Sequence, residues 1–133
     1  MLIVTTVSAS ILSFLYVNLS LEVIRYRQKY GISIGDSNQE DLLRAIRAHA
    51  NLTEYAPIAL ILLTCLELNR APLWLTSILA GIFVIGRLLH SVGMKSSESP
   101  WQARVWGIQL TLLSMIGIGI ANLVLVGMLE LAH

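Results

Sequence analysis

Four segments without a charged side chain set the main constraint on how this chain folds. No Asp, Glu, Lys or Arg occurs in residues 1–21, 55–66, 71–86 or 105–129. The last segment is long enough to cross a bilayer, for which about 20 helical residues suffice. The second and third are long enough only if adjacent polar residues join the same helix. Because backbone polar groups in hydrocarbon must be paired within the segment, helices are the expected structure.

The composition places the chain among membrane proteins. Hydrophobic residues make up 56% of the 133 residues and charged residues 13%, whereas soluble domains carry about 25% charged residues. The net charge of +1 gives no sign of nucleic-acid binding. We therefore predict one all-α integral membrane domain over residues 1–133, with four transmembrane helices in a left-handed bundle. The predicted helices cover about 2–28, 39–68, 73–95 and 101–130.

Individual residues predict how these helices begin and bend. Ser37 has an acidic residue three positions later, which is capping-box spacing, so Ser37 or Asn38 is expected to open the second helix. Pro57 lies inside that helix and is expected to kink it. Pro100 is expected near the start of the fourth helix. The single cysteine, Cys65, lies in an apolar run and is expected to be a small buried hydrophobe.

Basic residues indicate which helix ends face the cytoplasm. The link between the first two helices and the link between the last two lie on one side of the membrane, which we call the basic side. Its basic residues are Arg25, Arg27, Lys29, Arg44, Arg47, Lys95 and Arg104, with Arg87 deeper in the membrane. The opposite side holds only Arg70. Because cytoplasmic loops carry an excess of Lys and Arg, we expect both of these links to face the cytoplasm and both termini to face away from it.

Polar side chains form a stripe on three of the predicted helices, toward the basic side. In the second helix, Arg47, Asn51 and Glu54 are spaced i, i+4, i+7 and therefore share one face. Arg87 and His90 share a face of the third helix. The stripe of the first helix consists of Asn18, Glu22 and Arg25. Since a charge facing lipid costs about 2.5–3.5 kcal/mol near the bilayer centre, the stripes are expected to face inward or toward another subunit, and to meet.

Two interpretations of this polar region follow from the residues alone. In the first, Glu22 pairs with Arg25, and Glu54 pairs with Arg47 or Arg87, as buried ion pairs that fix helix register. In the second, the arginines bind an anionic guest. Arginines outnumber acidic residues in this region, and guanidinium binds carboxylates in a two-pronged geometry. An anionic lipid headgroup is one such guest. No metal site is expected, because no His, Cys, Asp or Glu cluster has ligand spacing.

The motifs on the second and third helices resemble those of a known family. Two patterns carry the resemblance: Arg-Ala-x-x-Asn-x-x-Glu at Arg47, Ala48, Asn51 and Glu54, and Gly-Arg-x-x-His at Gly86, Arg87 and His90. Both are similar to patterns of the MAPEG family, the membrane-associated proteins in eicosanoid and glutathione metabolism. The resemblance covers all four predicted helices and looks closest to small bacterial members that are similar to microsomal glutathione transferases. It therefore implies a protein of the bacterial inner membrane.

The resemblance implies a homotrimer with glutathione sites between neighbouring subunits, open to the cytoplasm. The residues that it implies for glutathione binding are Arg25, Arg47, Asn51, Glu54, Tyr55, Arg87 and His90. It also implies that Arg104 is catalytic and stabilises the glutathione thiolate. A nearby cation favours the thiolate, which is the nucleophile. The second substrate, a lipophilic electrophile or lipid hydroperoxide, is expected to arrive from the bilayer.

Two positions depart from the patterns of specialised family members. Met94 stands where some of the enzymes have a tyrosine, seven residues after the third-helix arginine. Ala50 stands where prostaglandin-E-synthase-like members have an arginine. Both departures count against a specialised eicosanoid synthase.

Three functions are compatible with this sequence. The first is a glutathione-dependent transferase or peroxidase of broad substrate range. The second is a non-catalytic lipid-binding membrane protein on the same scaffold, which has no need for Arg104 as a thiolate-stabilising group. The third is a small four-helix exporter with Glu22 as the proton-coupled residue, a function that gives no reason for the second-helix motif.

Overall fold

Four long α-helices make up the part of the chain that the structure describes. The computed structural model describes residues 1–131, so the last two residues of the predicted domain, 132 and 133, lie outside it. The helices are α1 (Ile3–Tyr30), α2 (Glu40–Leu68), α3 (Leu73–Met94) and α4 (Trp101–Leu131). Each predicted helix end lies within two residues of the observed one. All four helices are long and apolar enough to cross a membrane.

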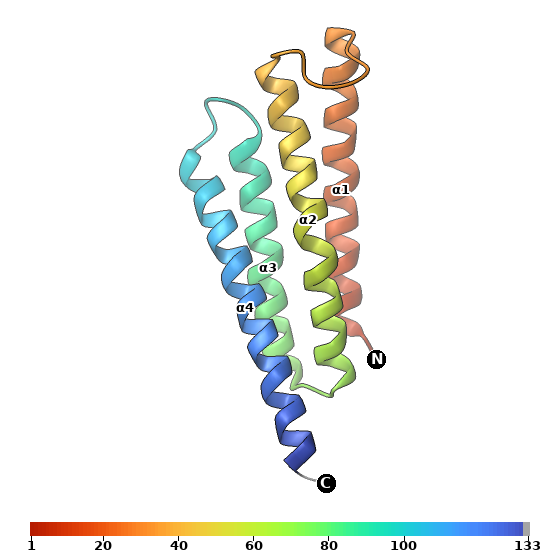
Figure 1. Cartoon of the computed structure of the whole chain (residues 1–133), viewed down its shortest axis with the longest axis vertical. Helices are drawn as coiled ribbons and strands as arrows, with labels where there is room; N and C mark the ends of the chain where they lie inside the picture. The colour runs from red at the N-terminus through yellow and green to blue at the C-terminus, as the bar shows by residue number, and fades with distance from the viewer. Residues whose placement is uncertain (132–133) are drawn as a thin grey trace.

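The helices run alternately up and down through the bundle. The α1–α2 and α3–α4 links lie at one end, while the start of α1, the α2–α3 link and the end of α4 lie at the other (Figure 1). The predicted placement of two links on the basic side and one on the opposite side is confirmed.

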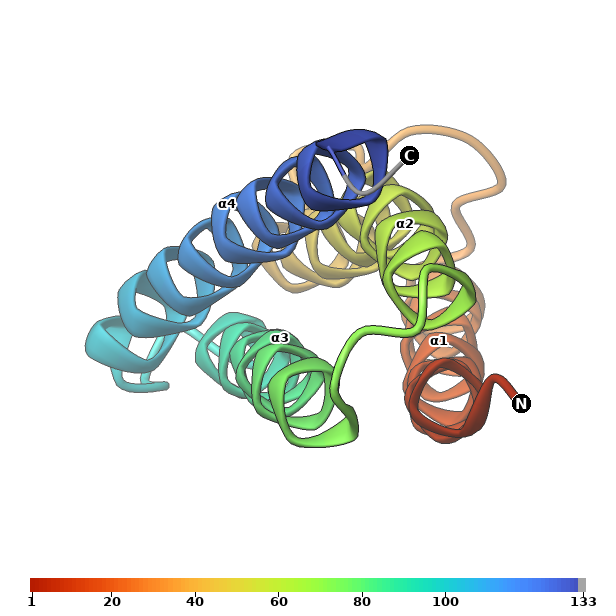
Figure 2. The same cartoon turned by 90° about the horizontal axis from the view of Figure 1, so that it is seen from below.

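The four helices surround the bundle axis in the order α1, α2, α4, α3 (Figure 2). α2 contacts the other three helices, and α3 and α4 share the most extensive contact. α1 packs mainly on α2, and its buried residues are spaced alternately three and four apart: Thr5, Ser8, Leu12, Leu15 and Leu19. This spacing is that of the seam in left-handed helix pairs. The seam therefore explains why α1 follows α2 along most of its length.

α3 and α4 approach closely because glycines line their crossing. A Cβ atom added to Gly86 would lie 2.9 Å from the carbonyl oxygen of Gly107. One added to Gly107 would overlap the backbone of His90, and one added to Gly93 would overlap the backbone of Arg104. Small residues permit such close approach of membrane helices. The position of α4 against α3 is therefore fixed at the backbone level.

A carboxylate of α2 caps the start of α1 on the opposite side. The Oε1 atom of Glu67 accepts from the backbone N–H of Val4 over 3.0 Å, and its Oε2 accepts from that of Thr5 over 2.7 Å. α1 has no side-chain cap of its own, and the first N–H groups of a helix need external acceptors. Glu67 therefore anchors α1 to the end of α2.

The predicted capping residue of α2 is wrong, although the helix begins close to the predicted position. Gln39 precedes the first helical residue, and no side chain caps the helix. Ser37 and Asn38 have φ values of 48° and 60°, in the left-handed region, whereas a capping residue is normally extended. Instead, the Oδ1 of Asp36 accepts from the Asn38 N–H over 3.0 Å. The turn-forming preference of Asp therefore prevails over the capping-box pattern.

The prediction that Cys65 is buried is also wrong for the single chain. Its side chain is exposed, because the apolar run of α2 has a lipid-facing side as well as a core side. The two prolines lie where the sequence predicted, with Pro57 inside α2 and Pro100 directly before α4.

Replacing Gly107 with Ala is expected to destabilise the bundle, because the new Cβ would overlap the His90 backbone. Overpacking of this kind costs about 1–3 kcal/mol and should lower the melting temperature in detergent. Gly119→Ala in the same helix is the matched control, since its Cβ meets nothing within 4 Å. Equal melting temperatures for the two variants would contradict the close α3–α4 contact.

Replacing Glu67 with Gln is expected to lower the free energy of unfolding by about 0.5–2 kcal/mol, the usual cost of losing a helix cap. The amide has one acceptor oxygen instead of two and lacks the charge that favours a helix N-terminus. Unfolding in mixed micelles, followed by circular dichroism, measures the change. Glu98→Gln in the α3–α4 link is the control, and an equal effect in both variants would contradict the cap.

Candidate functional site

A buried arginine joins α2 and α3 toward the basic side. Arg87 is only 2% exposed. Its Nη1 donates to Oδ1 of Asn51 over 2.7 Å, and more weakly to the backbone carbonyl oxygen of Asn51 over 3.4 Å. Its guanidinium carbon lies 5.3 Å from the centre of the Tyr55 ring, within the range of cation–π attraction. The structure thus brings three of the sequence-predicted binding residues into contact.

Much of the hydrogen-bonding capacity of Arg87 is unused. An arginine side chain has five N–H donors, and neither Nε nor Nη2 of Arg87 has a partner within residues 1–131. No carboxylate in that part of the chain forms an ion pair with it. A buried charge without a counter-charge is costly. The environment of Arg87 therefore favours the binding of an anion.

His90 and Arg104 lie where α3 crosses α4. His90 is buried one helical turn beyond Arg87, with the backbone of Gly107 against it. The backbone of Arg104 lies against Gly93 in the same crossing. The Arg104 side chain is exposed, and its Nη1 lies 4.0 Å from Sδ of Met94. The glycine contacts therefore fix the backbone positions of His90 and Arg104.

Three more of the predicted binding residues lie on the outside of the single chain. Arg47 and Glu54 of α2 and Arg25 of α1 are exposed. At 100° per residue, Arg47 and Glu54 lie on the side of α2 away from the buried Leu52. The buried ion pairs that the sequence allowed between these residues and their neighbours do not occur within residues 1–131. The structure does not bring these three residues together with Arg87 in one chain.

Two arginines of the basic side have local partners instead. Nη1 of Arg27 donates to the carbonyl oxygens of Ser33 and Gly35 in the α1–α2 link, over 3.0 and 3.2 Å. Arg44 forms the one ion pair found in the described residues, with Glu40 at 2.7 Å. Within residues 1–131, four arginines of the predicted site form no ion pair: Arg25, Arg47, Arg87 and Arg104.

A contact between α1 and α2 was not apparent from the sequence. The rings of Tyr16 and His49 lie 4.7 Å apart, and Nε2 of His49 is buried without a partner in the described chain. His49 is two residues from Arg47 and Asn51 and therefore lies on another face of α2. No spacing pattern identifies such a pair, because its two residues lie far apart in the sequence and on different helices.

The arrangement is suited to a small molecule with several carboxylates. The unpaired arginines can bind carboxylates, and the exposed Glu54 can bind an ammonium group. A cation near a bound thiol stabilises the thiolate. No group of three or more His, Cys, Asp or Glu side chains within residues 1–131 is placed to hold a metal ion.

Comparisons with known proteins identify the family of this chain. The model of the MAPEG family matches residues 5–124, and the chain belongs to this family. It is 32% identical over 120 residues to "Inner membrane protein YecN" of Escherichia coli strain K12, and equally to that of Escherichia coli O6:H1 strain CFT073, with 90% of each chain covered. Together with the four apolar helices, this relationship identifies an integral inner-membrane protein. The family inferred from the motifs is confirmed.

Replacing Asn51 with Asp is expected to give Arg87 a carboxylate partner where the amide oxygen now lies 2.7 Å away. The ligand-free protein should melt at a higher temperature, since a charge-assisted pair compensates a buried cation better than an amide does. Asn18→Asp, on the exposed face of α1, is the control and should not raise the melting temperature. A lower melting temperature for Asn51→Asp than for the control would mean that Arg87 needs no anion.

Proposed function

We propose that this chain is a glutathione-dependent transferase or peroxidase that acts on lipophilic electrophiles or lipid hydroperoxides. The observation that carries the proposal is the buried guanidinium of Arg87, which has two unpaired nitrogens beside Asn51 and Tyr55. Membership of the MAPEG family, which includes glutathione transferases, supports it.

Glutathione fits the chemistry of these residues. It carries two carboxylates, one ammonium group and one thiol. In the proposal, Arg87 and Arg47 bind the carboxylates, Glu54 binds the ammonium group, and Asn51 keeps Arg87 in place. Tyr55 and His90 line the same region. The basic side faces the cytoplasm, so that glutathione enters from there while the lipophilic substrate enters from the bilayer.

The proposed functional unit is a homotrimer in which one chain completes the site of its neighbour. Arg47 and Glu54 are exposed and face away from the core of their own chain. Facing lipid would cost about 2.5–3.5 kcal/mol for each charge near the bilayer centre. A neighbouring copy that covers this face of α2 removes that cost, and it can bring Arg25 to the glutathione.

Arg104 is the proposed catalytic residue. Its guanidinium stabilises the glutathione thiolate, whose proton passes to solvent. In conjugation to an aryl chloride, the sulfur attacks the ring carbon, the new C–S bond replaces the C–Cl bond, and chloride leaves. In peroxide reduction, the sulfur attacks the terminal oxygen of the hydroperoxide and an S–O bond replaces the O–O bond. The product on sulfur is the sulfenic acid of glutathione, and the alkoxide takes a proton from solvent and leaves as an alcohol. A second glutathione then reduces the sulfenic acid, giving glutathione disulfide and water.

Non-catalytic lipid binding is the second candidate, and Met94 is the observation that favours it. Nη1 of Arg104 contacts the thioether sulfur of Met94 at 4.0 Å. A thioether is only a weak hydrogen-bond acceptor and does not help to orient a thiol. This candidate predicts binding of fatty acids without thiol chemistry.

The proposal predicts that glutathione raises the melting temperature of the purified protein in detergent and that the protein conjugates glutathione to an activated aryl chloride. Arg104→Ala should abolish turnover and the ultraviolet absorbance of bound thiolate, while assembly mass and glutathione stabilisation persist. Arg87→Met should abolish the stabilisation by glutathione without unfolding the protein, because it removes an uncompensated buried charge.

Arg44→Ala is the matched control, since Arg44 is an arginine of α2 whose partner is Glu40 on the surface. It should retain binding and turnover. Unchanged turnover in Arg104→Ala would remove that residue from the mechanism. Stabilisation by fatty acids but not by glutathione would overturn the enzyme and favour the second candidate.

A further inference from the structure

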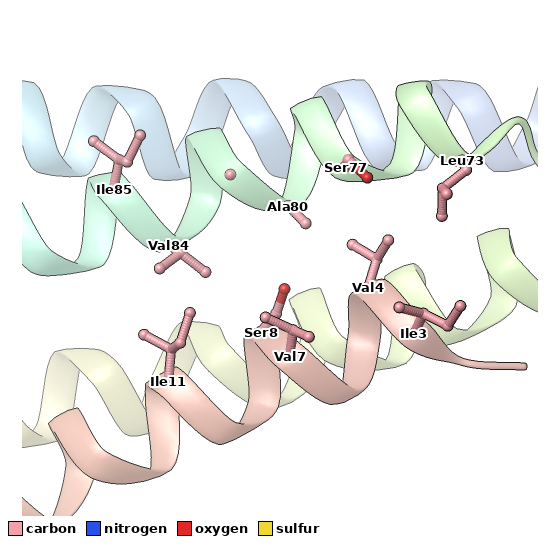
Figure 3. A pocket seen from close by; sticks show the side chains of 11 residues that line it. Ile3, Val4, Val7, Ser8, Ile11, Leu73, Ser77, Ala80, Val84 and Ile85 are labelled. Atoms are coloured by element: carbon pink, nitrogen blue, oxygen red, sulfur yellow. The ribbon is translucent and has the colours of Figure 1, made fainter.

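An apolar groove lies between α1 and α3, on the half of the molecule away from the arginines. Residues 3–11 of α1 and 73–85 of α3 form its walls (Figure 3). Its volume is about 390 Å³, within the range of about 300–1,000 Å³ that is typical of ligand pockets. Ser8 and Ser77 contribute the only polar side chains to the lining. The groove is thus suited to a hydrocarbon occupant.

Small residues on α3 keep this groove empty of protein side chains. Ser77, Ala80 and Gly81 line it, and a Cβ added to Gly81 meets nothing within 4 Å. On the other face of α3, a small residue has the opposite effect, because Gly86 lets α4 come into direct contact. Protein interiors are close-packed, and an unfilled space forfeits dispersion energy. In a bilayer, lipid acyl chains are available to fill this apolar space.

The groove runs along the two helices, and its length is close to the thickness of the hydrocarbon part of one lipid leaflet. It begins at Ile3 and Leu73, the first residues of α1 and α3, and extends along both helices to Ile11 and Ile85. At 1.5 Å per residue, the α3 wall is about 18 Å long. Half of a hydrocarbon core of about 30 Å is of similar size. An acyl chain that entered at the opposite side would therefore end near mid-membrane.

The surface end of the groove has groups that suit an anionic headgroup. Arg70 is exposed in the α2–α3 link, three residues before Leu73, and within residues 1–131 it is the only Lys or Arg on the opposite side. Trp74 follows Leu73 and is 65% exposed. Tryptophan favours the headgroup level, and arginine attracts anionic lipid. The charge of the link thus complements a lipid phosphate.

We propose that the α1–α3 groove binds one acyl chain of an anionic phospholipid from the leaflet on the opposite side, with the headgroup beside Arg70 and Trp74. The site is separate from the arginine region on the basic side. It does not depend on the proposed thiol chemistry.

Native mass spectrometry of the detergent-purified, delipidated protein tests this site, with palmitoyl-oleoyl phosphatidylglycerol as the probe. Gly81→Leu fills the groove, and Ser77→Leu is a second variant that narrows it. Gly119→Leu is the matched control, because a Cβ there also meets nothing within 4 Å but Gly119 does not line the groove. Circular dichroism verifies that each variant is folded.

Wild type and Gly119→Leu should each retain one phosphatidylglycerol per chain, and both groove variants should bind it about tenfold more weakly. Arg70→Gln should reduce the preference for phosphatidylglycerol over phosphatidylcholine without abolishing binding. Wild-type affinity in both groove variants would overturn the proposal. A changed oligomer mass in Gly81→Leu with unchanged lipid binding would also overturn it, since the groove would then belong to a second copy of the chain.

Discussion

The direct backbone contact between α3 and α4 determines where the cations of the candidate site lie. Gly86, Gly93 and Gly107 leave no room for a side chain at the crossing, so the two helices cannot shift without losing this contact. Arg87 directly follows Gly86, and the backbone of Arg104 lies against Gly93. The glycine of the Gly-Arg-x-x-His pattern therefore has a packing role, and it fixes the position from which Arg87 reaches α2.

The partner of Arg87 is an amide rather than a carboxylate, and this difference has a functional consequence. Asn51 orients the guanidinium through a 2.7 Å hydrogen bond but leaves its charge uncompensated. An aspartate at the same place would neutralise the charge and compete with any anion for the same donors. The Tyr55 ring supplies a weak attraction that likewise leaves Nε and Nη2 without a partner in residues 1–131. Asn51 and Tyr55 therefore orient a buried cation whose remaining N–H donors can bind an anionic ligand.

The helices, and the end of the bundle at which each link lies, were predictable because the length of a charge-free run is a property of a single segment. The contacts that position those helices depend on residues far apart in sequence. Glu67 was not singled out, since its partners are the backbone N–H groups of Val4 and Thr5, which have no sequence signature. The Arg47, Asn51 and Glu54 stripe was predictable from spacing, but spacing did not reveal that only Asn51 reaches Arg87 within the chain.

The groove between α1 and α3 is a fixed feature because α1 is held at both ends. On the opposite side, Glu67 binds the first N–H groups of α1. On the basic side, the Tyr30 hydroxyl donates to Oδ2 of Asp41 over 3.2 Å and joins the end of α1 to the start of α2. Between these anchors, the seam at Leu12 and Leu15 packs α1 on the core. α1 therefore cannot move toward α3 and close the groove without breaking these contacts with α2, so the groove stays open in the single chain.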